Sequence, residues 1–552
     1  MPPIAAGSIN YQFRFKRGLL LTSKCFFYYG KLGLKPPFVL SPVSTHFIRK
    51  QLYSLNPHKA VGLDGISALF LRDGADAIVR PFSHIVNMSI ISNTVPKSFK
   101  EAKVVPLFKK GSKLDPGNYR PVSILNVMSK ILEQTVHSQL SHYLRIRGLL
   151  FENQSGFRGG YSTDSSLICL TDYIKYQVGQ GNYTGMVLLD LRKAFDTVDH
   201  SILLDKLRAI GVNSVDWFDS YLKGRNQCVE VSASKSDVMP ISCGVPQGSI
   251  LGPLLFLVYV NDMCTSVNCM LSLYADDSAL LFSHRDPDVI ADRLSTELSN
   301  CMRWLVDNRL SLHVGKTECL IFGSKAKLKK VNSFSVLCDG TAVQRVHSVK
   351  YLGVLLDGSL CSSFHISSLL KICNGRLSFL FRNSSLLDFD TRKLLCNSLI
   401  QPYLDYCSSS WYSCLNSSLR SRLDVLQRKM VRFIYGFSNR RHVGASELRS
   451  LSWLNISDRV SYFKLVHIFR IRHDLAPSYM TSNFQLVCST HSYETRGSST
   501  NYFISKSLAT APSSFAFTAS KLWNSLPLRI KSIDSLPVFK RRLKEYLLSR
   551  YE

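Results

Sequence analysis

The chain has 552 residues, 45% of them hydrophobic, which is enough for about two to four domains with sizeable cores. Lysine and arginine number 68 against 39 aspartates and glutamates, and the net charge of +29 fits a protein that holds a polyanion such as a nucleic acid. A basic protein without such a partner is the alternative. No apolar run reaches the roughly 18 residues of a membrane span, so no membrane association is expected.

The 15 cysteines are scattered and include no Cys-x-x-Cys pair, and residues 16–30 are too broken by charge for a signal peptide. This usage argues against a zinc site and predicts reduced thiols. We therefore expect an intracellular protein of the nucleus and cytoplasm.

Residues 1–40 show no clear periodicity and are predicted to be an irregular lead-in. A Gly- and Asp-rich loop at 59–66 follows, which on physical grounds is a plain turn. A strand-like run from Val104 then ends in Lys109 and Lys110, and Arg120 lies in the next strand-like stretch. By themselves these cations suit a solvated basic turn, and the family resemblance described below implies instead that they lie in a basic hairpin.

Residues 129–145 carry apolar side chains at helical spacing and are predicted to form a packing helix. A glycine-rich loop at 154–163 follows and contains Arg158. The apolar run 186–189 then has the length of a strand and ends in Asp190, before a short helix-like segment with Phe195. Asp190 is thus predicted at the carboxyl end of a strand, and Phe195 by itself suits a core aromatic.

A Gly-Val-Pro-Gln-Gly-Ser stretch at 244–249 precedes an apolar helix predicted at 250–260. The next segment, 271–282, holds two strand-like apolar runs around the adjacent acids Asp276 and Asp277, which predicts a β-hairpin with the acids at its bend. Surface turns also favour Asp for local hydrogen bonds, so the Asp pair alone is weak evidence for a functional site. If the strand that ends at Asp190 pairs beside this hairpin, the three carboxylates would form a magnesium site suited to phosphoryl transfer.

Residues 289–310 are predicted as an amphipathic helix, followed by Lys316 at a turn and a short strand at 320–322. Tyr351 and Gly353 lie in a hairpin-like stretch at 349–354. The remaining predicted elements are helices at 423–435 and 451–474, a Ser/Thr-rich loop or short strand at 489–514, and a basic helix around 540–544. The basic face of 423–435 would suit a nucleic-acid duplex or merely solvent.

These motifs, in this order, resemble the reverse transcriptases of non-LTR retrotransposons, the jockey-like and related elements. The resemblance rests on Tyr-Ala-Asp-Asp at 274–277, Asp190 with Lys-Ala-Phe-Asp at 193–196, and the 244–249 motif, and it runs from about Lys59 to the C-terminus. It implies an α+β, right-hand polymerase fold of fingers, palm and thumb, with an antiparallel palm sheet and a helical C-terminal region.

The resemblance also implies a division of the chain. Residues 1–40 are a lead-in too short for an endonuclease, and the other regions are fingers (41–185), palm (186–357), a helical thumb-like region (358–450) and a basic C-terminal region (451–552). The reverse transcriptase domain overall would cover about 90–357.

By resemblance, the reaction is RNA-directed DNA synthesis: extension of a DNA primer on an RNA template with deoxynucleoside triphosphates. Asp190, Asp276 and Asp277 would bind two Mg²⁺ ions, with Mn²⁺ as an alternative, and integration would need a separate endonuclease activity. A catalytically inactive or domesticated nucleic-acid-binding protein derived from such an element is the main rival. An RNA-dependent RNA polymerase is a weaker third reading.

The other roles implied by the resemblance concern substrate contacts. Lys316 would approach the leaving pyrophosphate. The nucleotide would be bound by Lys109, Lys110, Arg120, Phe195 and Gln247, where the ring of Phe195 would clash with a 2′-hydroxyl and select deoxynucleotides. Template and primer would be contacted by Arg158, Gly248, Tyr274, Tyr351 and Gly353.

Overall fold

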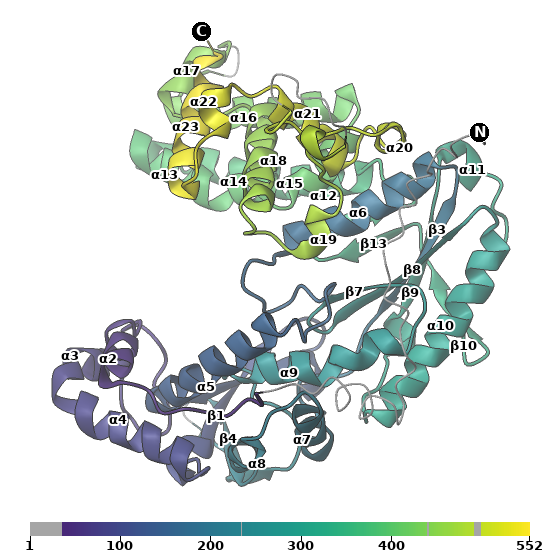
Figure 1. Ribbon diagram of the computed structural model, residues 1–552. Helices are drawn as coiled ribbons and strands as arrows, with labels where there is room; N and C mark the ends of the chain where they lie inside the picture. Colours follow the sequence, from purple (N-terminus) through teal and green to yellow (C-terminus); the bar gives the residue numbers. More distant parts are fainter. Residues whose placement is uncertain (1–35, 233, 439–440, 491–497, 552) are drawn as a thin grey trace. The chain divides into compact units, whose positions relative to one another are not determined.

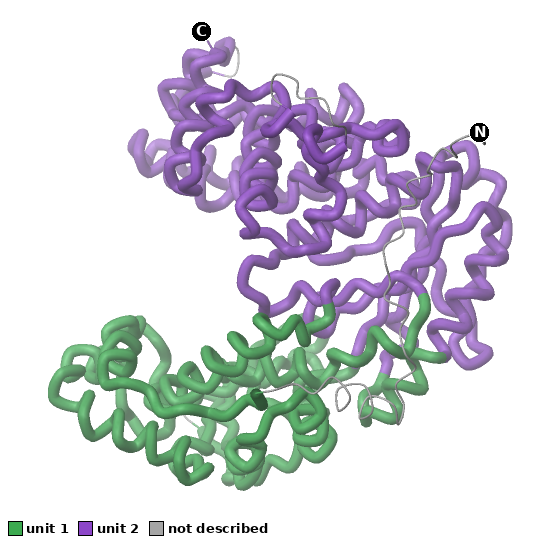
Figure 2. Tube along the Cα trace, in the orientation of Figure 1, with its two compact units in different colours: residues 1–151, 192–268, 300–311 green, residues 152–191, 269–299, 312–552 purple. Residues whose placement is uncertain are grey.

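The computed structural model describes residues 36–232, 234–438, 441–490 and 498–551. These residues form two compact units, each assembled from separate stretches of the chain (Figure 2). Unit 1 comprises residues up to 151, 192–268 and 300–311, and unit 2 comprises 152–191, 269–299 and the residues from 312 onward. Most of the predicted lead-in therefore lies outside the described residues.

Unit 1 combines a five-stranded sheet with helices. Its strand order is β2-β1-β4-β5, with β6 also paired to β4; β1 is antiparallel to β2 and parallel to β4. The elements are α2 (Thr45–Tyr53), α3 (Ala68–Asp73), α4 (Ala75–Ile91), β1 (Glu101–Phe108), β2 (Tyr119–Leu125), α5 (Val127–Ile146), α7 (His200–Ala209), α8 (Val215–Leu222), β4 (Arg225–Val231), β5 (Ser234–Lys235), β6 (Met239–Ile241) and α9 (Gly252–Val260).

Unit 2 contains a second five-stranded sheet, in the order β12-β9-β3-β8-β7, in which only β12 and β9 pair in parallel. The strands of unit 2 as a whole are β3 (Tyr183–Leu189), β7 (Met270–Tyr274), β8 (Asp277–His284), β9 (Glu318–Phe322), β10 (Leu337–Cys338), β11 (Thr341–Ala342), β12 (Gln344–Arg345), β13 (Ser348–Tyr351) and β14 (Val354–Asp357). The central strand β3 is buried along almost its whole length, which explains its unbroken apolar run.

The helices of unit 2 lie mostly in the last two hundred residues (Figure 1). They are α6 (Thr163–Gly179), α11 (Lys325–Leu328), α12 (Ser363–Arg382), α13 (Phe389–Leu399), α14 (Gln401–Asp405), α15 (Ser408–Trp411), α16 (Ser417–Tyr435), α17 (Ala445–Ser450), α18 (Ile456–Arg472), α19 (Ser478–Thr481), α20 (Lys506–Ala509), α21 (Phe515–Asn524), α22 (Leu528–Lys531) and α23 (Leu536–Ser549). α10 (Pro287–Asp307) contains residues of both units.

Helix α6 connects the sheet of unit 2 to the C-terminal helices. Its residues Leu167, Leu170 and Ile174 join a core with β3, α12 and α16, while Ile168 joins a second core with α18, α21 and α23. A capping box at Ser162 and Ser165 fixes where α6 begins. One helix thus has an apolar contact with each core.

Most predicted elements are confirmed with small shifts of their ends. The helices expected at 129–145, 250–260, 289–310, 423–435 and 451–474 correspond to α5, α9, α10, α16 and α18. The loop expected at 489–514 contains the short helix α20, and its residues 491–497 lie outside the described ranges. Within those ranges no disulfide forms, and no helix is long and apolar enough to cross a bilayer.

Candidate active site

The three predicted carboxylates meet at one edge of the sheet in unit 2. β3 pairs with β8 so that Leu189 lies opposite Ser278, and Asp190 therefore follows at the level of Asp277. β8 in turn pairs with β7 through Tyr274 and Asp277. Two strand ends far apart in the sequence thus deliver their acids to the same place, as predicted.

The hairpin between β7 and β8 turns on two residues, Ala275 and Asp276. Ala275 has a φ of 58°, a left-handed conformation that glycine usually supplies at the first central position of such a turn. For alanine this backbone costs about 1 kcal/mol or more. The surrounding contacts must therefore stabilise the bend.

The segment before β9 holds the backbone of Asp190 and places a lysine beside its carboxylate. His313 N donates a hydrogen bond of 2.7 Å to Asp190 O, and Leu191 and Leu312 form an antiparallel bridge. Lys316 Nζ lies 3.7 Å from Asp190 Oδ2, and both side chains are about half exposed. Lys316 is thus placed beside a predicted metal ligand.

The neighbouring acids affect the ionisation of Asp277. Desolvation, followed by the negative charges of Asp276 and Asp190, raises the pKa of Asp277 to about 6. The acids therefore stand close enough to repel one another. A divalent cation would relieve this repulsion, which makes the edge of the sheet electrostatically suited to one.

The donor set also suits magnesium. Mg²⁺ binds hard oxygen ligands and usually takes one or two carboxylates, completing its coordination with water and substrate phosphate. Within the described residues no group of three or more His, Cys, Asp or Glu side chains is arranged as a ready metal cage. The acids thus fit a magnesium ion that shares its ligands with a substrate.

The predicted basic residues of unit 1 lie on the hairpin of β1 and β2. Arg120 pairs with Leu107 across the hairpin, and Lys109 N donates to Asn118 O at 2.9 Å. The side chains of Lys109, Lys110 and Arg120 are exposed. The predicted basic hairpin is confirmed as a structure, and its cations can be reached by an anionic ligand.

Phe195 and Gln247 both lie in unit 1, and each is next to Asp196, Phe195 in the chain and Gln247 through a hydrogen bond. The Phe195 ring stacks on Phe256 with centroids 4.2 Å apart. Gln247 Nε2 donates a 2.7 Å hydrogen bond to the carboxylate of Asp196, whose pKa is raised by burial. Asp196 was absent from the predicted site, although its place beside Phe195 in the motif could have suggested it.

Two local details differ from or add to the prediction. The segment after Asp190 is a series of turns around Lys193, with a φ of 45°, rather than the helix-like stretch expected, because Asp196 N bonds back to Lys193 O. Gly248 has a φ of 128°, and a side chain there would meet Ser123 O at 2.3 Å. Glycine is thus required where the Gln247 loop passes β2.

The residues predicted to contact template and primer have different surroundings. Tyr274 is half-buried, and Gly353 is exposed at the turn between β13 and β14 with Tyr406 alongside. Arg158 donates to Gln154 O at 2.9 Å and stacks over the Tyr161 ring, so its guanidinium is engaged within the protein.

The structure corrects the prediction for Tyr351. This side chain is only 2% exposed, and its hydroxyl hydrogen-bonds with Ser272 on β7. Burial against the sheet precludes direct contact with a nucleic acid. Tyr351 therefore supports the hairpin from within the core.

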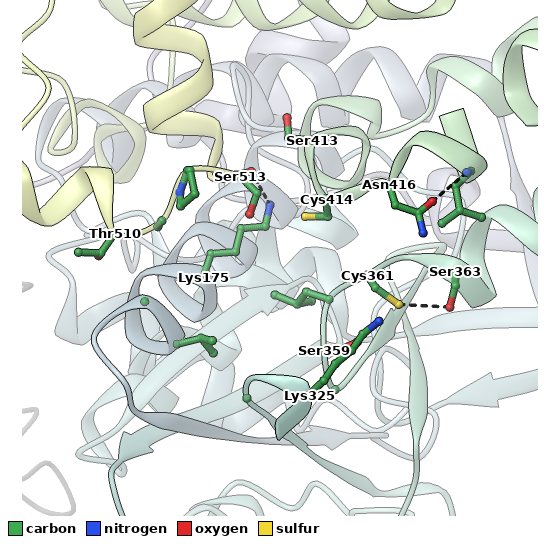
Figure 3. Close-up of a pocket in the computed structure, with 18 residues that line it drawn as sticks. Lys175, Lys325, Ser359, Cys361, Ser363, Ser413, Cys414, Asn416, Thr510 and Ser513 are labelled. Atoms are coloured by element: carbon green, nitrogen blue, oxygen red, sulfur yellow. Dashed lines mark hydrogen bonds between the residues drawn. The ribbon is translucent and has the colours of Figure 1, made fainter. Parts of the chain in front are cut away.

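A separate pocket of about 550 Å³ also lies in unit 2 (Figure 3). Lys175 of α6 borders it and reaches Ser513, and Cys361, Cys414 and Asn416 lie on other walls. None of the predicted site residues lines this pocket. It is therefore distinct from the carboxylate edge.

The sequence matches the reverse transcriptase (RNA-dependent DNA polymerase) family over residues 108–356. This range includes all three carboxylates, Lys316 and all five predicted nucleotide-binding residues. Residues 108–356 are a reverse transcriptase domain. The domain implies a right-hand polymerase fold, and the mixture of helices and sheets agrees with it.

Similar proteins extend the match beyond the reverse transcriptase domain. A probable RNA-directed DNA polymerase from transposon BS of Drosophila melanogaster is 28% identical over 72% of this chain and 45% of its own length. The RNA-directed DNA polymerase from mobile element jockey of Drosophila funebris is 27% identical over 73% of this chain and 45% of its own. The chain thus matches less than half the length of these relatives. The predicted resemblance to non-LTR elements is confirmed.

Proposed function

We propose that the protein is an RNA-directed DNA polymerase of a non-LTR retrotransposon, which extends a DNA 3′ end on an RNA template. The observation that carries the proposal is the strand register that places Asp190 beside the Asp276 and Asp277 bend. The match to the reverse transcriptase family and the names of the similar proteins support it.

Asp190 and Asp276 are proposed to hold two Mg²⁺ ions, with Asp277 assisting and Mn²⁺ as an alternative. Such ions, when bound, activate the attacking 3′ hydroxyl and stabilise the leaving oxygen of a phosphoryl transfer. The contribution of the chain is to fix the ligands at the ends of paired strands. Lys316, held near Asp190, is proposed to balance charge on the departing pyrophosphate.

The remaining contacts are proposed residue by residue. The exposed cations Lys109, Lys110 and Arg120 would bind triphosphate oxygens, for which the planar guanidinium of arginine is especially suited. Phe195 would exclude a 2′-hydroxyl, and Gln247 would contact the nucleotide. Gly248, Tyr274 and Gly353 would lie along template or primer, while Arg158 and Tyr351 would act indirectly, through the protein contacts they make.

We retain the proposed arrangement of fingers at 41–185, an antiparallel palm at 186–357, a thumb-like region at 358–450 and a basic C-terminal region at 451–552. The partners would be an RNA template, a DNA primer and deoxynucleoside triphosphates. An endonuclease activity would be needed for integration, and the protein would act in the nucleus and cytoplasm.

Primer extension on an RNA template with Mg²⁺ tests the proposal. The wild-type protein is expected to extend the primer, and Asp276→Ala is expected to lose the activity while binding template and primer normally. Asp288→Ala, which removes an exposed acid at the start of α10, is the matched control and should extend like wild type. Tight template binding without extension by the wild type would instead favour a domesticated nucleic-acid-binding protein.

A further inference from the structure

The loop at 153–158 lies along the edge of β7 that β8 leaves open. Ser155 N donates to Leu273 O at 2.9 Å, Leu273 N donates to Asn153 O at 3.0 Å, and Gln154 forms a parallel bridge with Leu273. The loop therefore acts as a short additional strand. It continues past Leu273 toward the bend that carries Asp276.

Gln154 is the residue of this loop that reaches the bend. Its Oε1 accepts hydrogen bonds of 2.9 Å from both Ala275 N and Gly156 N, and its Nε2 makes a longer contact of 3.5 Å with Ala275 O. The side chain is only 2% exposed, so it is held in one place by the core. Both backbone polar groups of Ala275 thus face a single buried amide.

Ala275 is the residue that needs such support. It adopts a left-handed φ without being glycine, and residues of this kind persist only where their surroundings over-determine them. Its carbonyl carbon is joined to Asp276 by the peptide bond between the two residues. An amide that fixes the Ala275 peptide groups therefore fixes the direction in which the Asp276 side chain leaves the bend.

Gly156 shows how closely the loop approaches. A Cβ built on Gly156 would lie 2.3 Å from Ala275 N, a distance that no side chain can occupy. The loop and the bend are consequently in backbone contact. Movement of one would be transmitted to the other.

The loop is also held on its far side. The hydroxyl of Tyr479, in α19, lies 3.0 Å from Ser155 Oγ and donates to Ser165 Oγ at 2.9 Å. Arg158 donates back to Gln154 O at 2.9 Å. The Gln154 loop is thus fixed between the hairpin and the C-terminal helices of unit 2.

We propose that Gln154 is a positioning residue for the polymerase reaction: its amide holds the Ala275 peptide so that Asp276 presents its carboxylate in a fixed place. The inference rests on the proposed role of Asp276 as a metal ligand. Catalytic groups must be held to within about 0.5 Å of their working geometry, which a strained alanine turn cannot secure by itself.

The test is Gln154→Met, which keeps the length of the side chain and removes its amide. We expect kcat for primer extension to fall by about 10- to 100-fold, the typical effect of losing a group that orients a metal ligand. The Mg²⁺ concentration for half-maximal activity should rise, while the KM for primer and template should stay near wild type. A wild-type kcat and Mg²⁺ requirement would overturn the proposal.

Gln427→Met is the matched control. Gln427 lies in α16, is 4% exposed and donates a 2.9 Å hydrogen bond to Leu454 O, so its loss removes an equally buried amide that does not touch the hairpin. The control should retain the wild-type Mg²⁺ requirement even if its melting temperature falls. An equal change in Mg²⁺ requirement in both variants would show a general loss of stability and overturn the proposal.

Two further variants complete the experiment. Gln154→Asn keeps the amide but withdraws it by one methylene, so it should show the same defect in a smaller degree; if Gln154→Met does not fold, a wild-type Mg²⁺ requirement in Gln154→Asn overturns the proposal. Asp276→Ala separates the two hypotheses. If it remains active, the proposed function fails; if it is inactive while Gln154→Met behaves as wild type, only the positioning role fails.

Discussion

Phe195 combines a fixed position with a proposed steric function. Its ring is half-buried and stacked on Phe256, so the side chain cannot swing away at little cost. A rigid ring is what discrimination by steric fit requires, because a mobile one would yield to a 2′-hydroxyl. The selectivity for deoxynucleotides should therefore depend on the size of this side chain.

Phe195→Ala is expected to admit ribonucleotides. The preference for deoxynucleotides over ribonucleotides, measured as the ratio of kcat/KM values in primer extension, should fall by about 10- to 100-fold. Deoxynucleotide incorporation by the same variant serves as the internal control and should change much less. An unchanged ratio would remove Phe195 from the proposed discrimination.

His365, at the start of α12, illustrates how burial sets a charge state. Desolvation lowers its pKa from 6.5 to about 4, while its Nδ1 accepts from Leu355 N and its ring lies edge-on to Trp411. In the unfolded chain the imidazole regains its ordinary pKa. Between about pH 6.5 and 4 the unfolded chain thus binds a proton that the folded protein does not, and stability must fall as the pH falls.

The expected loss attributable to His365 between pH 7 and pH 5 is about 2 kcal/mol. His365→Gln keeps an acceptor but cannot titrate, so its free energy of unfolding, measured in urea, should depend less on pH in this window. His347→Gln, at an exposed position, should keep the wild-type dependence. Parallel pH curves for wild type and His365→Gln would contradict the assignment.

At the scale of elements, α6 is held to the C-terminal helices by a buried polar contact. Asp172 accepts from Phe515 N at 2.6 Å and Ala516 N at 2.8 Å, the first amides of α21. Lys175, one turn along, donates to Ser410 O and Ser513 O. A buried carboxylate thus satisfies a helix N-terminus and offsets a neighbouring ammonium.

Asp172→Ala should destabilise the protein by about 3 kcal/mol, since it leaves both amides without their acceptor and removes the negative charge that offsets the buried Lys175 ammonium. Thermal unfolding should show a lower melting temperature. Asp292→Ala, which removes an exposed acid of α10, is the control and should change the melting temperature little. Equal melting temperatures for the two variants would mean that the contact adds nothing to stability.

The contrast between predicted and unpredicted elements follows from the range of the interactions. The Asp276 hairpin and the strand ending at Asp190 could be predicted because apolar runs and flanking acids are local signals. Gln154 could not, because its partner Ala275 lies 121 residues away and nothing in the sequence near Gln154 marks the contact. Tyr351 was misplaced because a tyrosine in a hairpin suits either a core or a ligand surface.

At the scale of the whole molecule, the chain passes repeatedly between two compact units, so the units cannot be read as consecutive segments of sequence. The C-terminal helices share unit 2 with the three carboxylates. Their core contains Trp523, Phe539 and Leu543, all buried, together with Ile168 of α6. The stability of the five-stranded sheet of unit 2 should therefore depend on residues far from the three carboxylates in sequence.

Phe539→Ala tests this dependence within α23. Removing a wholly buried ring from a packed core should cost about 3–5 kcal/mol, a large fraction of the roughly 5–15 kcal/mol that a folded domain possesses. Because α6 joins this core to the sheet that carries Asp190, primer extension should be lost at a lower temperature in the variant, in step with its unfolding. Val538→Ala, at the neighbouring and partly exposed position, should unfold and lose activity near the wild-type temperature. If Phe539→Ala melted early while polymerase activity survived to the wild-type temperature, the C-terminal helices would be shown to unfold independently of the active site.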